Sequence, residues 1–234
     1  MSINHIKIYP EMVQGSDAWI NARTGLITAS TMNLILTPTL KAASNDKERS
    51  HLYELVSQRI TGYTEPAYIS DDMLRGHDDE IDARELYRKK YAKVQEVGFI
   101  TNDSLGFPIG FSPDGLVKDD GFIEAKSRRM KLHMETLLTC VPAQIVPQEF
   151  VLQVQTGLFV SGRSWCDFIS YCGGLPMAVI HAEPDPVYQE AIIEAATKFE
   201  ARIVERVAQY KALMRKRKIW RLTPTERRIV QEMF

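Results

Sequence analysis

The segment from residue 111 to residue 126 constrains the fold more than any other part of the chain. Its Asp119-Asp120-Gly121 sequence is a turn signal between two apolar runs, which predicts a β-hairpin. If the turn centres on Asp119, Asp114 lies directly opposite Glu124, with Cβ atoms about 4.5–5.5 Å apart. Side chains alternate along a strand, so Lys126 shares the face of Glu124. One face of the hairpin is therefore expected to carry two carboxylates and one ammonium group.

Two carboxylates this close together repel each other unless a proton or a cation lies between them. Carboxylate oxygens are hard ligands, and they suit Mg²⁺ or Mn²⁺. The hairpin thus predicts a divalent-cation site at Asp114 and Glu124. The alternative is an exposed hairpin in which Glu124 and Lys126 are only a solvated pair.

A carboxylate is also expected inside the helix predicted over residues 72–94. Glu80 lies at the centre of the least polar stripe of that helix, whereas the other acidic residues fall on different faces. A carboxylate that faces the core is costly unless it is paired or close to a metal ion. Glu80 is therefore a candidate third acidic residue of the site, and an ion pair with Arg84 is the alternative.

The helix predicted over residues 147–160 contains two glutamines. Gln155 is flanked by apolar residues on its face, and Gln153 lies about 200° away around the helix. The two side chains cannot both face one site, and a buried amide must find partners. We expect Gln155 to face the site, with a purely structural amide as the alternative.

Hydroxyl groups and an arginine come together near the start of the chain. Ser16 is expected to cap a short helix that carries Trp19 and Arg23, and Thr28 or Ser30 is expected to begin the next helix. Helix N-termini with hydroxyls and a nearby arginine bind phosphate readily. This segment is a candidate phosphate site, and ordinary helix capping is the alternative.

The order of the predicted elements indicates an α/β fold with a central mixed β-sheet flanked by helices. No repeat or long linker interrupts the chain, so one domain over residues 1–234 is the simplest organisation. Strands are predicted over 97–101, 107–111, 122–126, 165–171 and 177–182, and helices over 52–60, 72–94 and 147–160, with a long amphipathic helix from Asp185-Pro186 and a last short helix capped by Thr223-Pro224-Thr225-Glu226.

The charge balance excludes a chain that binds nucleic acid through a strongly basic composition. The sequence has 29 basic and 30 acidic residues, for a formal charge of −1. Base is concentrated from Lys211 onward, and some of Arg215, Lys216, Arg217, Lys218 and Arg221 are expected to face a polyanionic ligand or a subunit interface, with a solvated helix face as the alternative. The 3 cysteines form no CxxC pair, which favours a reducing cytoplasm over a four-cysteine metal site. No signal peptide or membrane span is expected.

The acidic and basic residues of the hairpin resemble the PD-(D/E)xK nuclease motif. Asp114 is followed after a short interval by Glu124-Ala125-Lys126, and Gln155 begins a segment similar to the glutamine-plus-aromatic motif of the exonuclease branch. Residues 19–30 and Ser112-Pro113-Asp114-Gly115 are similar to segments of phage lambda exonuclease. The matches fall in order from about residue 14 to residue 182, and the chain is identified as a member of the lambda-exonuclease family of phage recombinases.

The resemblance implies a restriction-endonuclease-like catalytic core over residues 72–182, with end-binding helices over 16–62 and C-terminal helices over 186–234. It implies a Mg²⁺-dependent 5′→3′ exonuclease, with Mn²⁺ as a substitute, that digests one strand of linear duplex DNA and leaves 3′ single-stranded overhangs. It further implies a ring-shaped homotrimer, a single-strand annealing protein as partner, and a phage or prophage protein of the bacterial cytoplasm.

The resemblance also implies a role for each candidate residue. Lys126 would orient or deprotonate the attacking water, and Gln155 would position Lys126 or the water. Metal ligands would be Asp114, Glu124, the Ala125 carbonyl and Glu80. The terminal 5′-phosphate would be held by Arg23, Thr28 and Ser30, with Ser112 on a nearby phosphate and Trp19 packed on the substrate end.

Other activities remain open at the level of sequence. A different nuclease of the same fold, such as a resolvase, a restriction endonuclease or a RecB-type enzyme of other polarity, would use the same carboxylates. A non-catalytic DNA-binding protein would use the basic C-terminal segment. A glycosidase would use a carboxylate pair, but Lys126 beside Glu124 counts against it.

Overall fold

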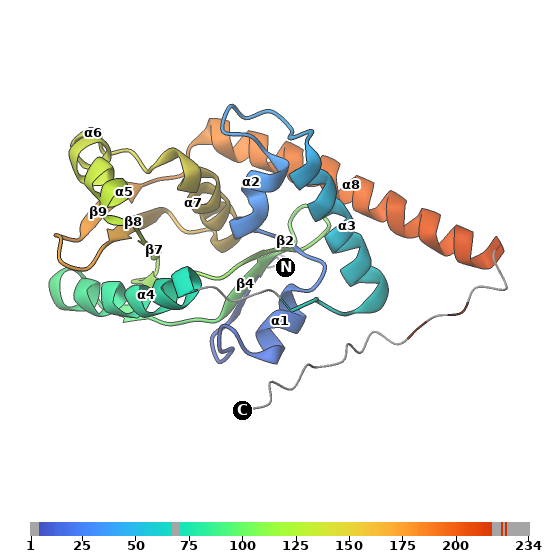
Figure 1. Cartoon of the computed structure of the whole chain (residues 1–234), viewed down its shortest axis with the longest axis horizontal. Helices are drawn as coiled ribbons and strands as arrows, with labels where there is room; N and C mark the ends of the chain where they lie inside the picture. Colours follow the sequence, from blue (N-terminus) through green and yellow to red (C-terminus); the bar gives the residue numbers. More distant parts are fainter. Residues whose placement is uncertain (1–4, 67–70, 217–220, 222, 224–234) are drawn as a thin grey trace.

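The computed structural model describes residues 5–66, 71–216, 221 and 223 (Figure 1). Two mixed sheets form its centre instead of the one that the sequence suggests. The smaller sheet has the strand order β1-β4-β5-β2, and the larger has the order β3-β6-β7-β8-β9. The smaller consists of β1 (Ile6–Tyr9), β4 (Phe99–Asn102), β5 (Ile109–Phe111) and β2 (Ile27–Thr28), and the larger of β3 (Val94–Gln95), β6 (Gly115–Val117), β7 (Gly121–Ser127), β8 (Trp165–Tyr171) and β9 (Ala178–Ala182).

Each sheet contains one parallel strand pair, β2 with β5 and β7 with β8, and the other pairs are antiparallel. Helices flank these sheets, so the α/β class with mixed sheets is confirmed. The helices are α1 (Asp17–Arg23), α2 (Met32–Ile35), α3 (Asp46–Thr61), α4 (Asp71–Lys90), α5 (Met130–Glu135), α6 (Val141–Ala143), α7 (Gln148–Ser161) and α8 (Pro186–Lys216), with a 3-10 turn at Ala29–Thr31 and a π-helical turn at Thr136–Cys140.

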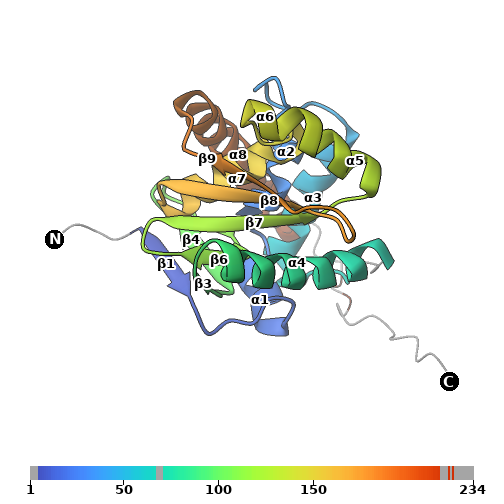
Figure 2. The same cartoon turned by 90° about the vertical axis from the view of Figure 1, so that its left-hand side faces the viewer.

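The two faces of the larger sheet are covered by different helices, as Figure 2 shows. Helix α4 lies on one face, where Tyr87 packs against Ile123 and Ala125 of β7. Helices α7 and α8 belong to the main core on the other face, where Phe122 of β7 is buried. Strand β7 is therefore buried on both sides, so side chains that point away from α4 enter the interior.

The hairpin has the predicted register. Gly115 pairs with Ile123, Leu116 with Phe122 and Val117 with Gly121, which places the turn around Asp119. The local turn chemistry was sufficient to predict this pairing because a hairpin register follows from its turn.

Several elements were not predicted from the sequence. Strand β1 is an edge strand in which none of the four residues is buried, which leaves a weak hydrophobic pattern. Strands β2, β3 and β6 have only two or three residues each. The helical block from α5 to α6 exposes several apolar side chains, and its sequence therefore lacks a clear amphipathic period. Strands expected from residues 97 and 107 begin at Phe99 and Ile109.

Helix α8 projects beyond the body of the protein (Figure 1). Its apolar stripe is buried from Ile192 to Ile203, where it packs near α3 and α7. Leu213, on the same stripe, is 40% exposed because the body ends before it. Arg215 and Lys216 lie in its exposed last turn, whereas Arg217, Lys218 and most of the predicted final helix lie outside the described residues.

The described residues contain no single helix that is long and apolar enough to cross a membrane. One bent pair, Met130–Ala143 with Gln148–Ser161, meets the criteria by length and composition alone.

Candidate active site

Strand β7 and the loop before β6 bring the two hairpin carboxylates together. Asp114 Oδ2 accepts a hydrogen bond from the Ala125 N–H at 2.6 Å, which fixes the Asp114 side chain against β7. Glu124 is buried, and its Oε1 lies 2.6 Å from Lys126 Nζ. The predicted group of two carboxylates and one ammonium therefore exists in the structure.

Burial and mutual repulsion raise the pKa values of the acidic residues. Desolvation is the main cause in each case; it raises the pKa of Glu124 to about 7 and that of Glu80 to about 8, and the neighbouring Asp114 charge adds to both. The pKa of Asp114 is also raised by burial. Burial alone would lower the pKa of Lys126, but the Glu124 and Asp114 charges outweigh it and hold that pKa above its usual value. Lys126 is thus an ammonium ion when these carboxylates are charged.

The carboxylates fit a divalent cation by donor chemistry. Glu124 Oε1 is engaged by Lys126, whereas Glu124 Oε2 is buried and has no hydrogen-bond partner. A buried carboxylate oxygen without a partner is costly, and a cation would satisfy it. Across the described part of the chain, no three histidine, cysteine or acidic side chains are arranged to hold a metal ion by themselves. Glu80 is close enough to Asp114 and Glu124 for their negative charges to add to the rise in its pKa.

The expected role of Gln155 is wrong in placement, because Gln153 is the glutamine that contacts the acidic group. Gln153 Nε2 donates to Glu124 Oε1 at 2.5 Å. Gln155 instead donates to the Glu183 carbonyl at 2.8 Å and accepts from the Asp185 N–H at 2.9 Å. The two glutamines do point to different places, as the helix period requires, but the assignment between them is reversed.

The two glutamines should respond differently to alanine substitution. Gln153→Ala should lower a metal-dependent activity by about 10- to 100-fold, because Glu124 loses the hydrogen bond that orients its carboxylate. Gln155→Ala should instead cost about 1–3 kcal/mol of stability, since it leaves the Glu183 and Asp185 backbone groups unpaired. The measurements are the initial rate of the metal-dependent reaction and the thermal midpoint of unfolding, both taken on each variant. A fully active Gln153→Ala protein would remove Gln153 from the site.

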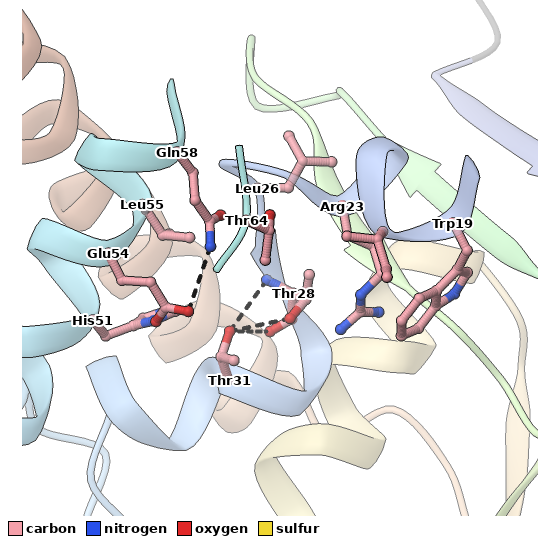
Figure 3. Close-up of a pocket in the computed structure, with 11 residues that line it drawn as sticks. Trp19, Arg23, Leu26, Thr28, Thr31, His51, Glu54, Leu55, Gln58 and Thr64 are labelled. Atoms are coloured by element: carbon pink, nitrogen blue, oxygen red, sulfur yellow. Dashed lines mark hydrogen bonds and ion pairs between the residues drawn. The ribbon is translucent and has the colours of Figure 1, made fainter. Parts of the chain in front are cut away.

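The predicted phosphate-binding residues also lie together. Arg23 Nη1 donates to Ser112 Oγ at 3.1 Å, and Arg23 Nη2 donates to Ser30 Oγ at 3.4 Å. The Arg23 guanidinium stacks on Trp19, with 4.2 Å from Cζ to the ring, and Trp19 Nε1 donates to Ser112 Oγ at 2.9 Å. Figure 3 shows Trp19, Arg23 and Thr28 around one pocket of about 170 Å³. We call Trp19, Arg23, Thr28, Ser30 and Ser112 the hydroxyl–arginine cluster.

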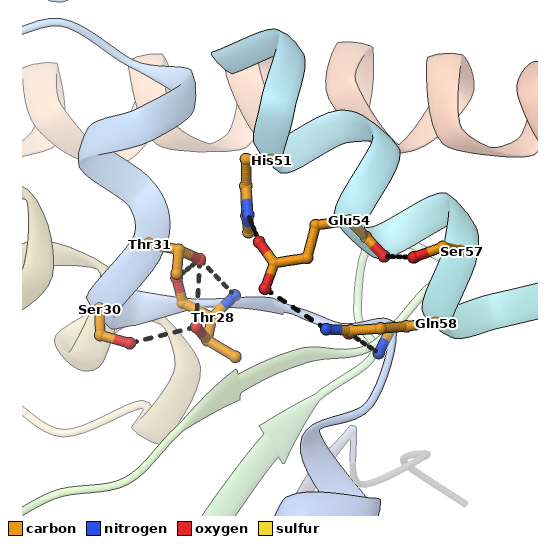
Figure 4. Close-up of polar contacts among 8 residues, drawn as sticks. Thr28, Ser30, Thr31, His51, Glu54, Ser57 and Gln58 are labelled. Atoms are coloured by element: carbon orange, nitrogen blue, oxygen red, sulfur yellow. Dashed lines mark hydrogen bonds and ion pairs between the residues drawn. The ribbon is translucent and has the colours of Figure 1, made fainter. Parts of the chain in front are cut away.

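The hydroxyls of this cluster are supplied by local backbone structure. Thr28 caps the 3-10 turn, and its Oγ1 contacts Ser30 Oγ at 3.2 Å and Thr31 Oγ1 at 3.1 Å (Figure 4). Thr28 is buried, whereas Ser30 is exposed. Burial lowers the pKa of Arg23 to about 10, so its charge is present at neutral pH. An anion bound near Ser30 could therefore form a charge-assisted hydrogen bond with the Arg23 guanidinium.

A groove of about 730 Å³ is bordered by one residue of the hydroxyl–arginine cluster and by two of the acidic residues. Its walls include Trp19 from the cluster, Glu80 from α4 and Asp114 from the hairpin. Arg84 also lines it, where Arg84 Nη1 donates to the Asp114 carbonyl at 3.1 Å and Arg84 Nη2 lies 3.3 Å from Glu96. The alternative in which Arg84 serves as the ion-pair partner of Glu80 is therefore replaced by these contacts. Trp19 therefore borders both this groove and the pocket that Arg23 and Thr28 line.

This combination agrees with a match to a protein-family model. The model for the YqaJ-like viral recombinase domain matches residues 18–164, from the hydroxyl–arginine cluster through α7. The chain belongs to the YqaJ-like viral recombinase family. The match spans Arg23, Glu80, Asp114, Lys126 and Gln153 of this YqaJ-like protein.

Solved structures place the same fold in phage-type exonucleases. The alkaline exonuclease LHK-Exo from Laribacter hongkongensis is 30% identical, with a TM-score of 0.74 over 86% of this chain and 99% of that chain. Its complex with dAMP is 31% identical, with a TM-score of 0.73 over 87% and 99% of the two chains. These matches confirm the resemblance to the lambda-exonuclease family of phage recombinases.

A phage-related exonuclease from Haemophilus somnus 129PT shares the fold at 13% identity, with a TM-score of 0.54 over 77% of this chain and 96% of that chain. The comparison with curated proteins gives no match.

Proposed function

We propose that this recombinase is a Mg²⁺-dependent exonuclease that digests the 5′-ended strand of linear duplex DNA and leaves 3′ overhangs for recombination. The observation that carries the proposal is the groove shared by Trp19, Glu80 and Asp114. An enzyme that begins at a 5′-phosphate end needs a phosphate site within reach of its reacting group. The dAMP complex of LHK-Exo supports a nucleotide ligand for this fold.

The residues of the site divide the work of phosphodiester hydrolysis. Asp114 and Glu124, with the Ala125 carbonyl, would hold Mg²⁺, with Glu80 acting through a water molecule, and Mn²⁺ would substitute for Mg²⁺. When bound, the cation supplies a Lewis acid that stabilises charge developing on the phosphate oxygens. Gln153 and Lys126 both contact Glu124 Oε1, so Glu124 Oε2 is the oxygen that remains for the cation. Lys126 is held protonated, so its ammonium donates hydrogen bonds that orient the attacking water.

A digestion of linear duplex labelled at either the 5′ or the 3′ end tests this function. We expect 5′-labelled mononucleotides to appear first, and only with Mg²⁺ or Mn²⁺ present. Release from the 3′ end would reverse the proposed polarity. Cleavage of covalently closed circular DNA would favour an endonuclease, and metal-independent binding without cleavage would favour a DNA-binding protein.

Arg23 should govern the preference for phosphorylated ends. Wild-type protein is expected to favour 5′-phosphorylated over 5′-hydroxyl duplexes, because the Arg23 guanidinium can form a charge-assisted pair with the terminal phosphate. Arg23→Ala should remove this preference while slowing the hydroxyl substrate much less. The ratio of the two initial rates is the measurement. An unchanged ratio in the variant would separate Arg23 from end recognition.

The stability of the metal-free protein should fall as pH rises. The folded pKa values of Glu80 and Glu124 lie above the ordinary value of 4.5, so their contribution is complete below that value and is lost as pH rises through about 7 and 8. A cation binds the deprotonated carboxylates, so Mg²⁺ should raise the thermal midpoint more at about pH 9 than at about pH 6. Thermal melts with EDTA or Mg²⁺ provide the measurement. A Glu80→Gln, Glu124→Gln double variant should lose both trends, and equal Mg²⁺ shifts at the two pH values in wild type would contradict the assignment.

We also propose that the protein assembles as a homotrimeric ring around DNA and acts with a single-strand annealing protein in a bacterial host. The exposed Arg215 and Lys216 at the end of α8 are candidates for the DNA path or a subunit interface. The mass in solution, measured by light scattering, should correspond to three chains.

A further inference from the structure

The side of β7 that carries Glu124 and Lys126 continues to a third charged residue, Arg128. The Arg128 N–H donates to the Tyr171 carbonyl at 2.8 Å, so the chain still follows β8 after β7 ends. Both Lys126 and Arg128 approach the Phe150 ring, with 5.9 Å from Lys126 Nζ and 5.1 Å from Arg128 Cζ to its centroid. Arg128 therefore extends the row of site residues along the same surface.

Arg128 has hydrogen-bonding capacity that the protein does not use. The residue is 8% exposed, and its Nε is buried without a hydrogen-bond partner. It lines a cavity of about 260 Å³ with Thr136 of the π-helical turn and residues 145–149. A buried guanidinium nitrogen without a partner, in the wall of a cavity, favours an anion with several oxygen acceptors.

The first turn of α7 lies at the same cavity. Helix α7 is 14 residues long, and its cap residue Pro147 provides no side-chain hydrogen bond. The N-terminal N–H groups of such a helix attract anions. Arg128 and this helix end thus offer complementary donors to one anionic group.

A carboxylate already occupies the place expected for an anion. Glu149 Oε1 lies 2.6 Å from Arg128 Nη1, and Glu149 belongs to the first turn of α7. The Glu149 side chain is 51% exposed, so it can leave without being buried elsewhere. Glu149 is in this respect a stand-in for an external ligand.

We propose that Arg128 and the N-terminus of α7 form a second phosphate site, which binds a backbone phosphate of the DNA strand beside the one being cut, in place of the Glu149 carboxylate. The proposal rests on the proposed nuclease function. It assigns Arg128 to substrate binding and Glu149 to competition with the substrate.

The two residues should have opposite effects on DNA affinity. Binding of a labelled duplex is measured with EDTA present, so that binding is read without cleavage. Arg128→Ala should weaken binding by about tenfold or more, the equivalent of one charge-assisted hydrogen bond, and should flatten the log–log salt slope by about one unit. Glu149→Gln should tighten binding severalfold, because it removes the competing charge. With Mg²⁺, Arg128→Ala should raise KM more than it lowers kcat.

Glu194→Gln is the matched control, because it makes the same charge change on an exposed residue of α8 that pairs with Lys198. Glu149→Gln binding equal to or weaker than this control would overturn the proposal and leave the Arg128–Glu149 pair purely structural, even if Arg128→Ala fails to fold. If the variants change only inhibition by added dAMP and not duplex affinity, the assignment to a backbone phosphate is wrong. Failure of the proposed function itself would appear differently, as wild-type protein that leaves duplex DNA intact with Mg²⁺.

Discussion

Replacing Lys126 with alanine should lower Mg²⁺-dependent strand digestion by roughly 10²- to 10⁴-fold, the usual contribution of a group that assists proton transfer or water positioning. The physical reason is the location of Nζ, 2.6 Å from Glu124 Oε1 and close to the carboxylates that would hold the cation. DNA affinity should change little, since the ammonium is one of many positive charges and is mostly buried. Initial rates and equilibrium binding to the same duplex are the measurements.

Lys198→Ala is a suitable control for this substitution. Lys198 lies on α8, pairs with Glu194 and is 65% exposed, so it removes the same charge without touching the groove. A Lys126→Ala rate within about tenfold of wild type would show that Lys126 is not part of the reacting group. Asp114→Ala and Glu124→Ala should lose Mg²⁺ binding as well as activity, which separates the acidic residues from Lys126.

Glu200→Ala should produce the largest loss of stability among alanine substitutions of the acidic residues of α8. Arg59 of α3 and Glu200 form two parallel contacts, of 2.5 Å and 2.7 Å, and Arg59 Nε also donates to the Gly25 carbonyl at 2.7 Å. The side chains are 22% and 11% exposed, so removal of Glu200 leaves a largely buried guanidinium without its counter-ion. We expect a loss of about 2–4 kcal/mol, below the upper range for fully buried pairs because water reaches Arg59.

The measurement is the thermal midpoint, which should fall by roughly 5–15 °C for a chain of this size. Glu194→Ala serves as the control, because its ion pair with Lys198 is exposed and is worth about 0–1 kcal/mol. Similar melting of the two variants would contradict the argument. The Arg59–Glu200 pair connects α3 and the Gly25 segment to α8, so the Glu200→Ala protein should also bind 5′-phosphorylated ends less tightly.

The sequence alone was sufficient for features that depend on neighbouring residues. The turn at Asp119 sets the hairpin register, and this register places Asp114 beside the Glu124–Lys126 strand. The capping preference of Ser16 is likewise local, and its side chain accepts from the Trp19 N–H as expected. Motif spacing and local chemistry therefore predicted that Glu124 and Lys126 lie on one face beside Asp114, and that Arg23 lies near the hydroxyl of Ser30.

The choice between Gln153 and Gln155 could not be made from the period of α7. Both glutamines have apolar neighbours, because α7 packs against β-strands on one side and against α2 and α8 on others. A helix surrounded in this way has no single polar face, so periodicity states that the two side chains diverge but not which one meets Glu124. Phe150, which packs near Lys126, lies on the Gln153 side and was the available signal.

Tertiary structure alone decided how the separate motifs meet. The groove brings Trp19 of α1, Glu80 of α4 and Asp114 of the hairpin onto one surface, although they are far apart in the sequence. The environment of Arg128 also depends on packing, because its cavity is formed by the π-helical turn and the start of α7, which the sequence did not predict as neighbours. Turns and caps are encoded within a few residues, whereas a shared groove depends on how sheets and helices pack, which no short-range pattern records.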